Sequence, residues 1–280
     1  MDIRINGEKA DITLEKEKTV GEILAGLDNW LGAADTVSGN YYRLSGLVID
    51  GETIDSQSLE ASFGRDLSTI NSLDISVSNL HELVHAALGE TQRAVKAWGE
   101  LDFSEKQGFA ENWKTSPSAA LLREQYPELC IMVQQTLAGE GFWEQILSTI
   151  ISERLRELEK PGAEIEGMEQ LIDDIAARLE NLPLDIQTGK DKRASETIQL
   201  FTAIAEKIFR IYKILKARGY NFDGIKKDFL NEFSGILKEM LAAYEQKDAV
   251  LLGDMSEYEM APRLRAFYAG LKNPASGSAG

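Results

Sequence analysis

The spacing of apolar residues changes once along this chain, and this change constrains the possible fold more than any other feature of the sequence. Before residue 80 apolar and polar residues alternate, as at Ile3 and Ile5, and this period is typical of strands with one buried face. From residue 80 onward apolar residues recur every three or four positions, which is the spacing of an amphipathic helix. The pattern predicts an α+β protein, with a β-rich domain over residues 1–79 and a larger all-α antiparallel helical-bundle domain over residues 80–272. Residues 273–280 are small and polar and are expected to form a disordered tail.

The β-rich part predicts the order strand, strand, helix, strand, strand, strand. The helix begins after the capping box Thr19-Val20-Gly21-Glu22, in which the Thr19 and Glu22 side chains each accept from a backbone N–H of the first turn. The expected strands cover residues 3–5, 10–14, 44–49, 52–54 and 73–77. The expected inner face of the helix carries Val20, Ile23, Leu24, Leu27, Trp30 and Leu31.

This order resembles the β-grasp fold of ubiquitin-like and sulfur-carrier domains. The resemblance is carried by the opening Ile5-Asn6-Gly7-Glu8, by the helix after Thr19-Val20 and by the ending Asn71-Ser72-Leu73-Asp74-Ile75-Ser76-Val77. It covers about the first 80 residues. Carriers of this family end in a free Gly-Gly that becomes activated, whereas here Ser78-Asn79-Leu80 leads directly into a helix. The resemblance therefore implies the protein-binding use of the fold and not carrier chemistry.

The helical remainder is punctuated by proline, glycine and polar segments. A first helix is expected up to about Leu101, followed by shorter helices broken near Pro117 and Pro127. A polar connection is expected over residues 187–195, and Gly219 is placed to end the longest helix. The remaining helices are expected over residues 142–158, 165–182, 225–244 and 248–271.

One motif in this part has the pattern of a zinc peptidase, His81-Glu82-Leu83-Val84-His85. Two histidines four residues apart on a helix can share a Zn²⁺ ion, and the intervening glutamate can act as the general base on a metal-bound water. On this interpretation His81 and His85 are zinc ligands, Glu82 is the catalytic base and zinc is the cofactor. These are the only histidines in the chain, so the third ligand has to be a carboxylate. Candidates at usable separations are Glu111, Glu124 and Glu128.

A second interpretation of the same residues requires no metal. The buried stripe of this helix centres near Val84, Thr91 and Trp98, which places the histidines on its flank and Glu82 toward solvent. Asn79 and Glu82 also form a helix-capping sequence, with Asn79 as the N-cap. We therefore expect no catalytic residue and no cofactor, and we retain the zinc metallopeptidase as the alternative.

Near the C-terminus, Asp254, Glu257, Tyr258 and Glu259 are candidates for binding a partner. The acidic side chains suit a basic partner, and Tyr258 can serve as an aromatic anchor. Asp248 is expected to cap the helix that precedes them. Alternatively, the same segment has only a structural role, as an amphipathic helix that closes the bundle.

Charge and composition limit the class of function. The formal net charge of −16 disfavours nucleic-acid binding, because an acidic surface repels phosphate, and it suits a solubilising surface or a basic protein partner. The single cysteine, Cys130, lies in an apolar run and is expected to be buried. No apolar stretch predicts membrane insertion, no signal peptide is evident, and a cytoplasmic protein is expected. The sequence thus predicts a non-catalytic adaptor, scaffold or chaperone-like module that binds a protein partner or a second copy of itself.

Overall fold

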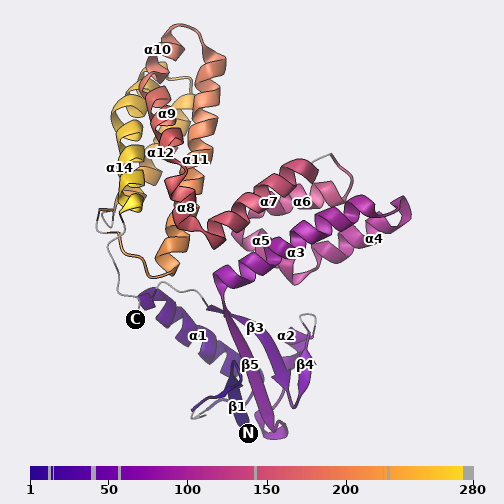
Figure 1. Cartoon of the computed structure of the whole chain (residues 1–280). Coiled ribbons are helices and arrows are strands. Elements are labelled where there is room, and N and C mark those ends of the chain that lie inside the picture. Colours follow the sequence, from indigo (N-terminus) through magenta and orange to yellow (C-terminus); the bar gives the residue numbers. More distant parts are fainter. Residues whose placement is uncertain are drawn as a thin grey trace. The chain divides into compact units, whose positions relative to one another are not determined.

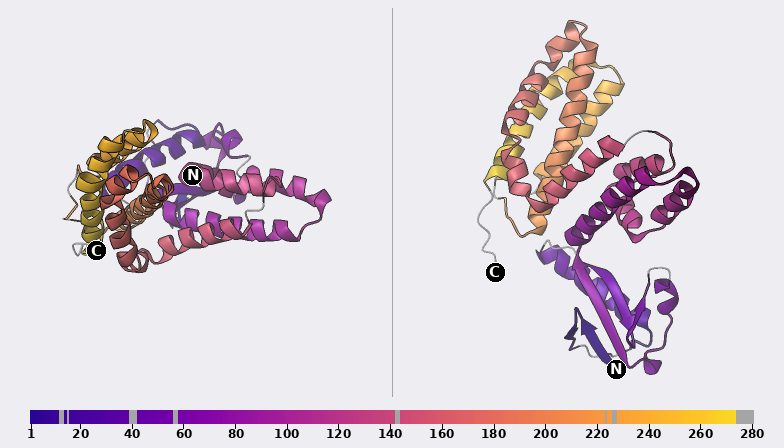
Figure 2. Two further views of the ribbon diagram at one scale, coloured as in Figure 1. Left: turned by 90° about the horizontal axis from the view of Figure 1, so that it is seen from above. Right: turned by 45° about the vertical axis from the view of Figure 1, so that its right-hand side comes forward.

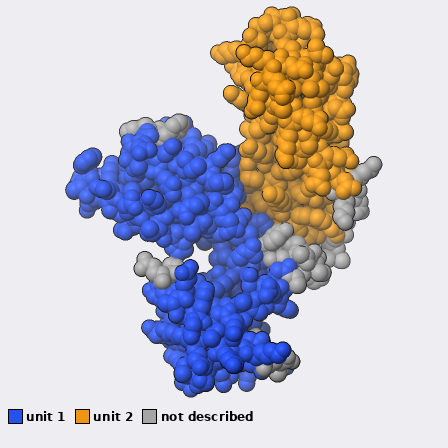
Figure 3. Space-filling view, turned by 180° about the vertical axis from the view of Figure 1, so that it is seen from behind, with its two compact units in different colours: residues 1–155 blue, residues 156–280 orange. Residues whose placement is uncertain are grey.

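The computed structural model divides the chain into two compact units, residues 1–155 and 156–280 (Figures 1, 2 and 3). It describes residues 1–11, 14, 16–38, 42–55, 58–141, 144–222, 224–225 and 228–273, without the side chains of residues 33–38. The first unit holds a sheet with one long helix against it and a set of helices, and the second unit is helical (Figure 1). The α+β class is therefore confirmed. The division lies inside the region that we expected to form one helical domain, and a domain boundary at residue 79 stays a prediction.

A mixed five-stranded sheet forms the start of the first unit, with the order β2-β1-β5-β3-β4. Its strands are β1 (Asp2–Ile5), β2 (Glu8–Lys9), β3 (Tyr42–Ile49), β4 (Glu52–Ile54) and β5 (Ser72–Asn79). The central β5 runs parallel to β1 and antiparallel to β3. Asn6 and Gly7 form the turn between β1 and β2, with φ angles of 51° and 80°, a left-handed conformation that suits these two residue types. The expected element order is confirmed, and the relationship to ubiquitin-like domains stays a prediction.

Helix α1 (Val20–Ser38) packs on one face of this sheet. The expected capping box is present: the Glu22 carboxylate accepts from the Thr19 N–H at 3.1 Å, and the Thr19 hydroxyl accepts from the Glu22 N–H at 3.4 Å. Val20, Ile23, Leu24 and Leu31 are buried against Leu47, Leu73 and Ile75 of the sheet. Two short helices, α2 (Leu59–Ser62) and η1 (Leu67–Thr69), connect β4 to β5.

Two sequence predictions in this part are wrong. Trp30 was assigned to the buried face of α1, yet 64% of its surface is exposed, because it lies on the flank of the apolar stripe. The second strand was expected over residues 10–14, but β2 ends at Lys9 and Leu14 is 37% exposed. Ile12, the middle residue of that expected strand, lies outside the described residues.

The helices of the first unit begin without a linker, since β5 ends at Asn79 and α3 begins at Leu80. Asn79 is the N-cap, as predicted, and its side chain accepts from the His81 N–H at 2.8 Å. The predicted breaks at Pro117 and Pro127 are confirmed, because each proline begins a helix. Cys130 is buried as expected, and burial raises the pKa of its thiol. These helices are α3 (Leu80–Glu100), α4 (Phe103–Lys114), α5 (Pro117–Gln125), α6 (Pro127–Leu137) and α7 (Glu144–Glu159), the last of which crosses into the second unit.

The second unit is a helical bundle built around α11. Its core includes Phe201, Phe209, Phe233 and Phe267, whose ring centroids lie 5.1–6.4 Å apart in the tilted and edge arrangements that aromatic rings favour. Gly219 ends α11 with a φ angle of 83°, as predicted. The elements are α8 (Pro161–Glu166), α9 (Glu169–Glu180), α10 (Leu182–Gln187), α11 (Asp191–Ala217), α12 (Phe229–Glu245), α13 (Ala249–Asp254), the π-helical turn η2 (Met255–Met260) and α14 (Ala261–Lys272).

One further prediction fails in the second unit. The polar connection expected over residues 187–195 is in part helical, because α11 already begins at Asp191. The helix expected over residues 248–271 is confirmed, since helical structure runs without a gap from Ala249 to Lys272, with η2 as a π-helical turn inside it. Within the described ranges, no helix is both long and apolar enough to cross a membrane.

Candidate functional site

His81, Glu82 and His85 lie in the first two turns of α3. Both histidines are partly buried on the flank of the helix, and Glu82 is exposed, as the capped-helix interpretation expects. Among the residues that the structure describes, no group of three or more His, Cys, Asp or Glu side chains is placed to hold a metal ion. A catalytic zinc needs three protein ligands. The described part of the chain therefore does not provide the ligand set that the metallopeptidase alternative requires.

The predicted partner-binding residues of the C-terminal segment lie in and next to η2. Tyr258 is 66% exposed, and a hydrogen bond from its hydroxyl to Glu257 raises its pKa, with a smaller contribution from the negative charge of Asp254. The structure therefore brings Asp254, Glu257 and Tyr258 together. Glu259 points elsewhere and forms an ion pair with Arg263, one turn further along.

Two residues favour the π-helical turn. Pro262 has no N–H and cannot donate a helical hydrogen bond to the carbonyl four residues earlier, that of Tyr258. The buried Ser256 hydroxyl donates to the Leu252 carbonyl at 2.6 Å, a side-chain bond that competes with the regular helix pattern. Such turns are frequent at functional sites, and this one directs an exposed tyrosine outward next to two carboxylates.

A different surface lies along α1. Five strands at a spacing of about 4.8 Å place the two edge strands about 19 Å apart, whereas one helix is only about 10 Å wide. A single helix therefore leaves an uncovered strip of sheet on each side. The structure has an apolar groove at each of these strips, with volumes of about 390 and 380 Å³.

The first groove, which we call the Trp30 groove, lies between α1 and β1. Apolar side chains form its floor, with Ile23 buried and Ile5 and Leu27 partly buried. Leu14 and the exposed Trp30 also line it. Its charged lining residues are all acidic: Asp11, Glu17 and Glu22. The groove thus combines an apolar floor, an exposed indole and a negative rim.

The Glu22 carboxylate of this rim remains ionised at neutral pH. The backbone N–H groups of Lys18 and Thr19 donate to the Glu22 carboxylate and hold its pKa below the usual value. The backbone N–H of Lys16 donates to the Glu17 carboxylate at 3.1 Å. Residues 1–79 contain 14 acidic and 6 basic residues, so the whole sheet domain is negative. The second groove, lined by Leu31, Leu44 and Phe63, contains one charged residue, Asp28.

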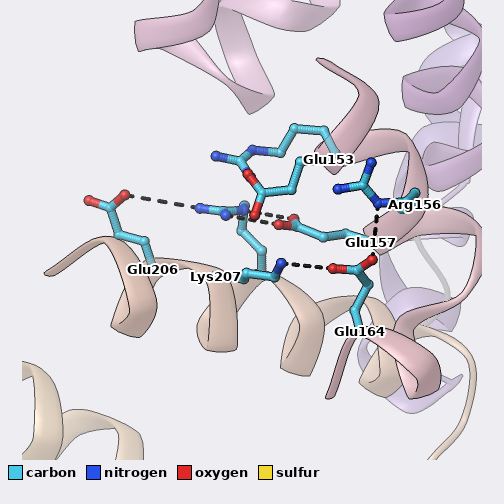
Figure 4. Close-up of polar contacts among 8 residues, drawn as sticks. Glu153, Arg156, Glu157, Glu164, Glu206 and Lys207 are labelled. Atoms are coloured by element: carbon cyan, nitrogen blue, oxygen red, sulfur yellow. Dashed lines mark hydrogen bonds and ion pairs between the residues drawn. The ribbon is translucent and has the colours of Figure 1, made fainter. Parts of the chain in front are cut away.

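The ionic cluster of the second unit has a structural role (Figure 4). Glu157 is fully buried and accepts two hydrogen bonds from Arg210, at 2.9 and 3.0 Å. Glu164 accepts from Lys207 at 2.7 Å and from Arg156 at 3.2 Å. Burial alone would raise the pKa of Glu164, but Lys207 and Arg156 outweigh it and hold this pKa below the usual value. Each carboxylate is satisfied by a cation, so the cluster attaches the end of α7 and α8 to α11.

Sequence reasoning missed the Trp30 groove. The sequence predicts Trp30 on the inner face of a helix and Leu14 at the end of a strand, and no sequence motif marks the groove. The available signal was that one helix is too narrow to cover a five-stranded sheet, combined with the acidic residues around position 17.

An α+β protein, with a mixed sheet followed by helices in its first unit and a helical bundle in its second, is the class that this architecture defines. Two family models match parts of the chain: residues 1–79 match the TP0873 N-terminal domain, and residues 164–269 match a domain of unknown function, DUF8042. No curated protein matches the sequence. No solved structure matches it either.

Proposed function

We propose that this protein is a non-catalytic adaptor that binds a basic segment of a partner protein in the Trp30 groove. The observation that carries the proposal is the groove itself, which combines an apolar floor and an exposed tryptophan with charged lining residues that, in the described part of the chain, are all acidic. A volume of about 390 Å³ lies within the range of small binding pockets, about 300–1,000 Å³.

The side chains that line the Trp30 groove determine which chemical groups of a partner can bind there. An apolar side chain that enters the groove is removed from water, which stabilises the complex by about 25 cal/mol for each Å² buried. Lysine or arginine side chains that flank it meet Asp11, Glu17 and Glu22, and their ammonium or guanidinium groups can also contact the Trp30 ring. Tryptophan is one of the residue types enriched among the residues that contribute most binding energy at interfaces.

Fluorescence anisotropy with two labelled synthetic peptides tests the proposal. One peptide carries two leucines flanked by lysines, and the other carries glutamates in place of the lysines. We expect the basic peptide to bind the full chain, to bind more weakly as salt increases, and to bind at least about tenfold more tightly than the acidic peptide.

Two matched variants locate the site. Trp30→Ala is expected to weaken binding of the basic peptide by about tenfold or more. Phe103→Ala removes another aromatic residue of the same unit, which is 94% exposed and lies outside the groove, and it should leave binding unchanged. Equal binding of both peptides, or equal losses in the two variants, would refute the proposal.

A further inference from the structure

A second apolar surface lies at the end of the second unit where α10 packs against α13. The two helices approach closely, since a Cβ atom placed on Gly253 would lie 3.0 Å from the Pro183 ring. The exposed apolar residues here are Leu184 (54%), Tyr244 (39%), Val250 (76%) and Leu251 (47%). A groove of about 550 Å³, lined by Tyr244, Asp191, Glu245 and Lys247 among others, opens in the same region. We call these residues the α10–α13 patch.

The backbone at Lys247 has a left-handed conformation, which is unfavourable for lysine. The helix ends at Gly139, Gly189 and Gly219 share one hydrogen-bond pattern, in which the next residue's N–H donates to a carbonyl five residues earlier. The end of α12 has the same pattern, from the Asp248 N–H to the Ala243 carbonyl at 2.9 Å, but its left-handed residue is Lys247, with a φ angle of 58°. Glycine adopts this conformation at lower cost. Lysine at this position places a cation in the groove, but it makes the end of α12 less stable than glycine would.

The charges of the patch are self-complementary. Its lining holds one cation, Lys247, and two carboxylates, Asp191 and Glu245. In a symmetric dimer the same surface of each copy meets the other, so Lys247 of one copy can face the carboxylates of the second. A purely basic or purely acidic partner would leave charges of one sign unmatched.

The distribution of charge over the chain agrees with a second copy as the occupant. Residues 156–280 contain 21 of the 46 acidic and 18 of the 30 basic residues, whereas residues 1–155 contain 25 acidic and 12 basic residues. Almost all of the negative charge therefore lies in the first unit. Two copies of the second unit can approach each other with little long-range repulsion.

We infer that the α10–α13 patch is a homodimer interface, in which Val250 and Leu251 are buried across a twofold axis and Lys247 pairs with Glu245 and Asp191 of the other copy. The inference is independent of the Trp30 groove, which lies in the other unit.

Sedimentation velocity of the full chain over a concentration series tests the interface. The wild type is expected to show a reversible monomer–dimer equilibrium. Val250→Asp buries a charge in the interface and should raise the dissociation constant by at least about tenfold. Lys247→Glu and Glu245→Lys should each do the same, and the double variant should recover part of the lost affinity, because a twofold axis pairs the exchanged charges again while Asp191 then meets a carboxylate.

Two controls separate this interface from general effects. Lys238→Glu makes the same charge change at an exposed position within α12 and should leave the dissociation constant unchanged. Lys247→Gly should raise the unfolding midpoint and weaken the dimer, opposite effects that loss of folding does not produce. A chain that is monomeric at every concentration, a dimer that tolerates Val250→Asp, or a double variant as weak as the single ones would overturn the inference.

Discussion

Removing Arg210 is expected to destabilise the second unit more than removing Glu157, although the two residues form one ion pair. The Glu157 side chain is completely buried and the Arg210 side chain is 20% exposed. Arg210→Met leaves a buried carboxylate without its bidentate partner. Glu157→Leu leaves a partly exposed guanidinium that can still reach water and the Glu206 carboxylate, 4.0 Å away.

The magnitudes follow from this asymmetry. Removing the bidentate partner of a fully buried carboxylate costs about 3–5 kcal/mol, which we expect for Arg210→Met. Losing hydrogen bonds to a charged group that can be resolvated costs about 1.5–3 kcal/mol, which we expect for Glu157→Leu. The double variant replaces the pair by apolar groups, so it should be more stable than Arg210→Met alone, giving a favourable coupling energy.

Tryptophan fluorescence allows the unfolding of the first unit to be followed separately in this assay. All four tryptophans lie in residues 1–155, so urea unfolding followed by tryptophan fluorescence reports the first unit, whereas far-ultraviolet circular dichroism reports both. The variants should shift the circular dichroism transition by much more than the fluorescence transition. Equal losses in the two single variants, or a double variant that is the least stable of the three, would refute this reasoning.

Four other outcomes are expected. Glu164 has a lowered pKa in the folded state, so its contribution to stability is complete above its usual value of 4.5 and is lost as the pH falls through the lowered value; Glu164→Gln should lower the urea midpoint at pH 7, and the difference from wild type should shrink as the pH falls below 4.5. Asn79→Ala removes the N-cap of α3 and should cost about 1 kcal/mol in the same assay, whereas a cost near zero would contradict the role of the 2.8 Å bond to the His81 N–H. Metal analysis of untagged protein should find much less than one zinc per chain, and stoichiometric zinc that is lost in His81→Ala would restore the peptidase alternative. If η2 contributes to partner binding, Tyr258→Ala and Glu257→Gln should each weaken capture of a basic partner, whereas Glu259→Gln, whose carboxylate is already paired with Arg263, should not.

Local sequence patterns correctly predicted the features that depend on neighbouring residues alone. The stripe of α3, the capping box at Thr19 and the glycine stop at Gly219 depend on residues close in sequence, and all three are confirmed. The start of α11 was misplaced because a helix can extend through polar residues when its later turns are anchored in a core, and periodicity does not register that support.

Candidate binding surfaces were harder to predict than buried elements, because they depend on which side chains the rest of the fold leaves uncovered. Trp30 has the spacing of a core residue, and only the width of the sheet shows that the flank of α1 faces a groove. The turn η2 depends on Pro262 and on the Ser256 hydroxyl, whose position follows from the packing of the whole bundle. The residues at Asp254, Glu257 and Tyr258 were proposed from composition alone, and the structure separates them from Glu259.

The direct passage from β5 into α3 has a consequence for how the first unit opens. Asn79 is both the last residue of the central strand and the cap of the helix, so fraying of one weakens the other. Slow amide hydrogen exchange should therefore extend without a step from β5 into α3, as in a single cooperative folding unit. The family match that ends at residue 79 would then end inside one cooperative folding unit, at a point where the chain has no linker.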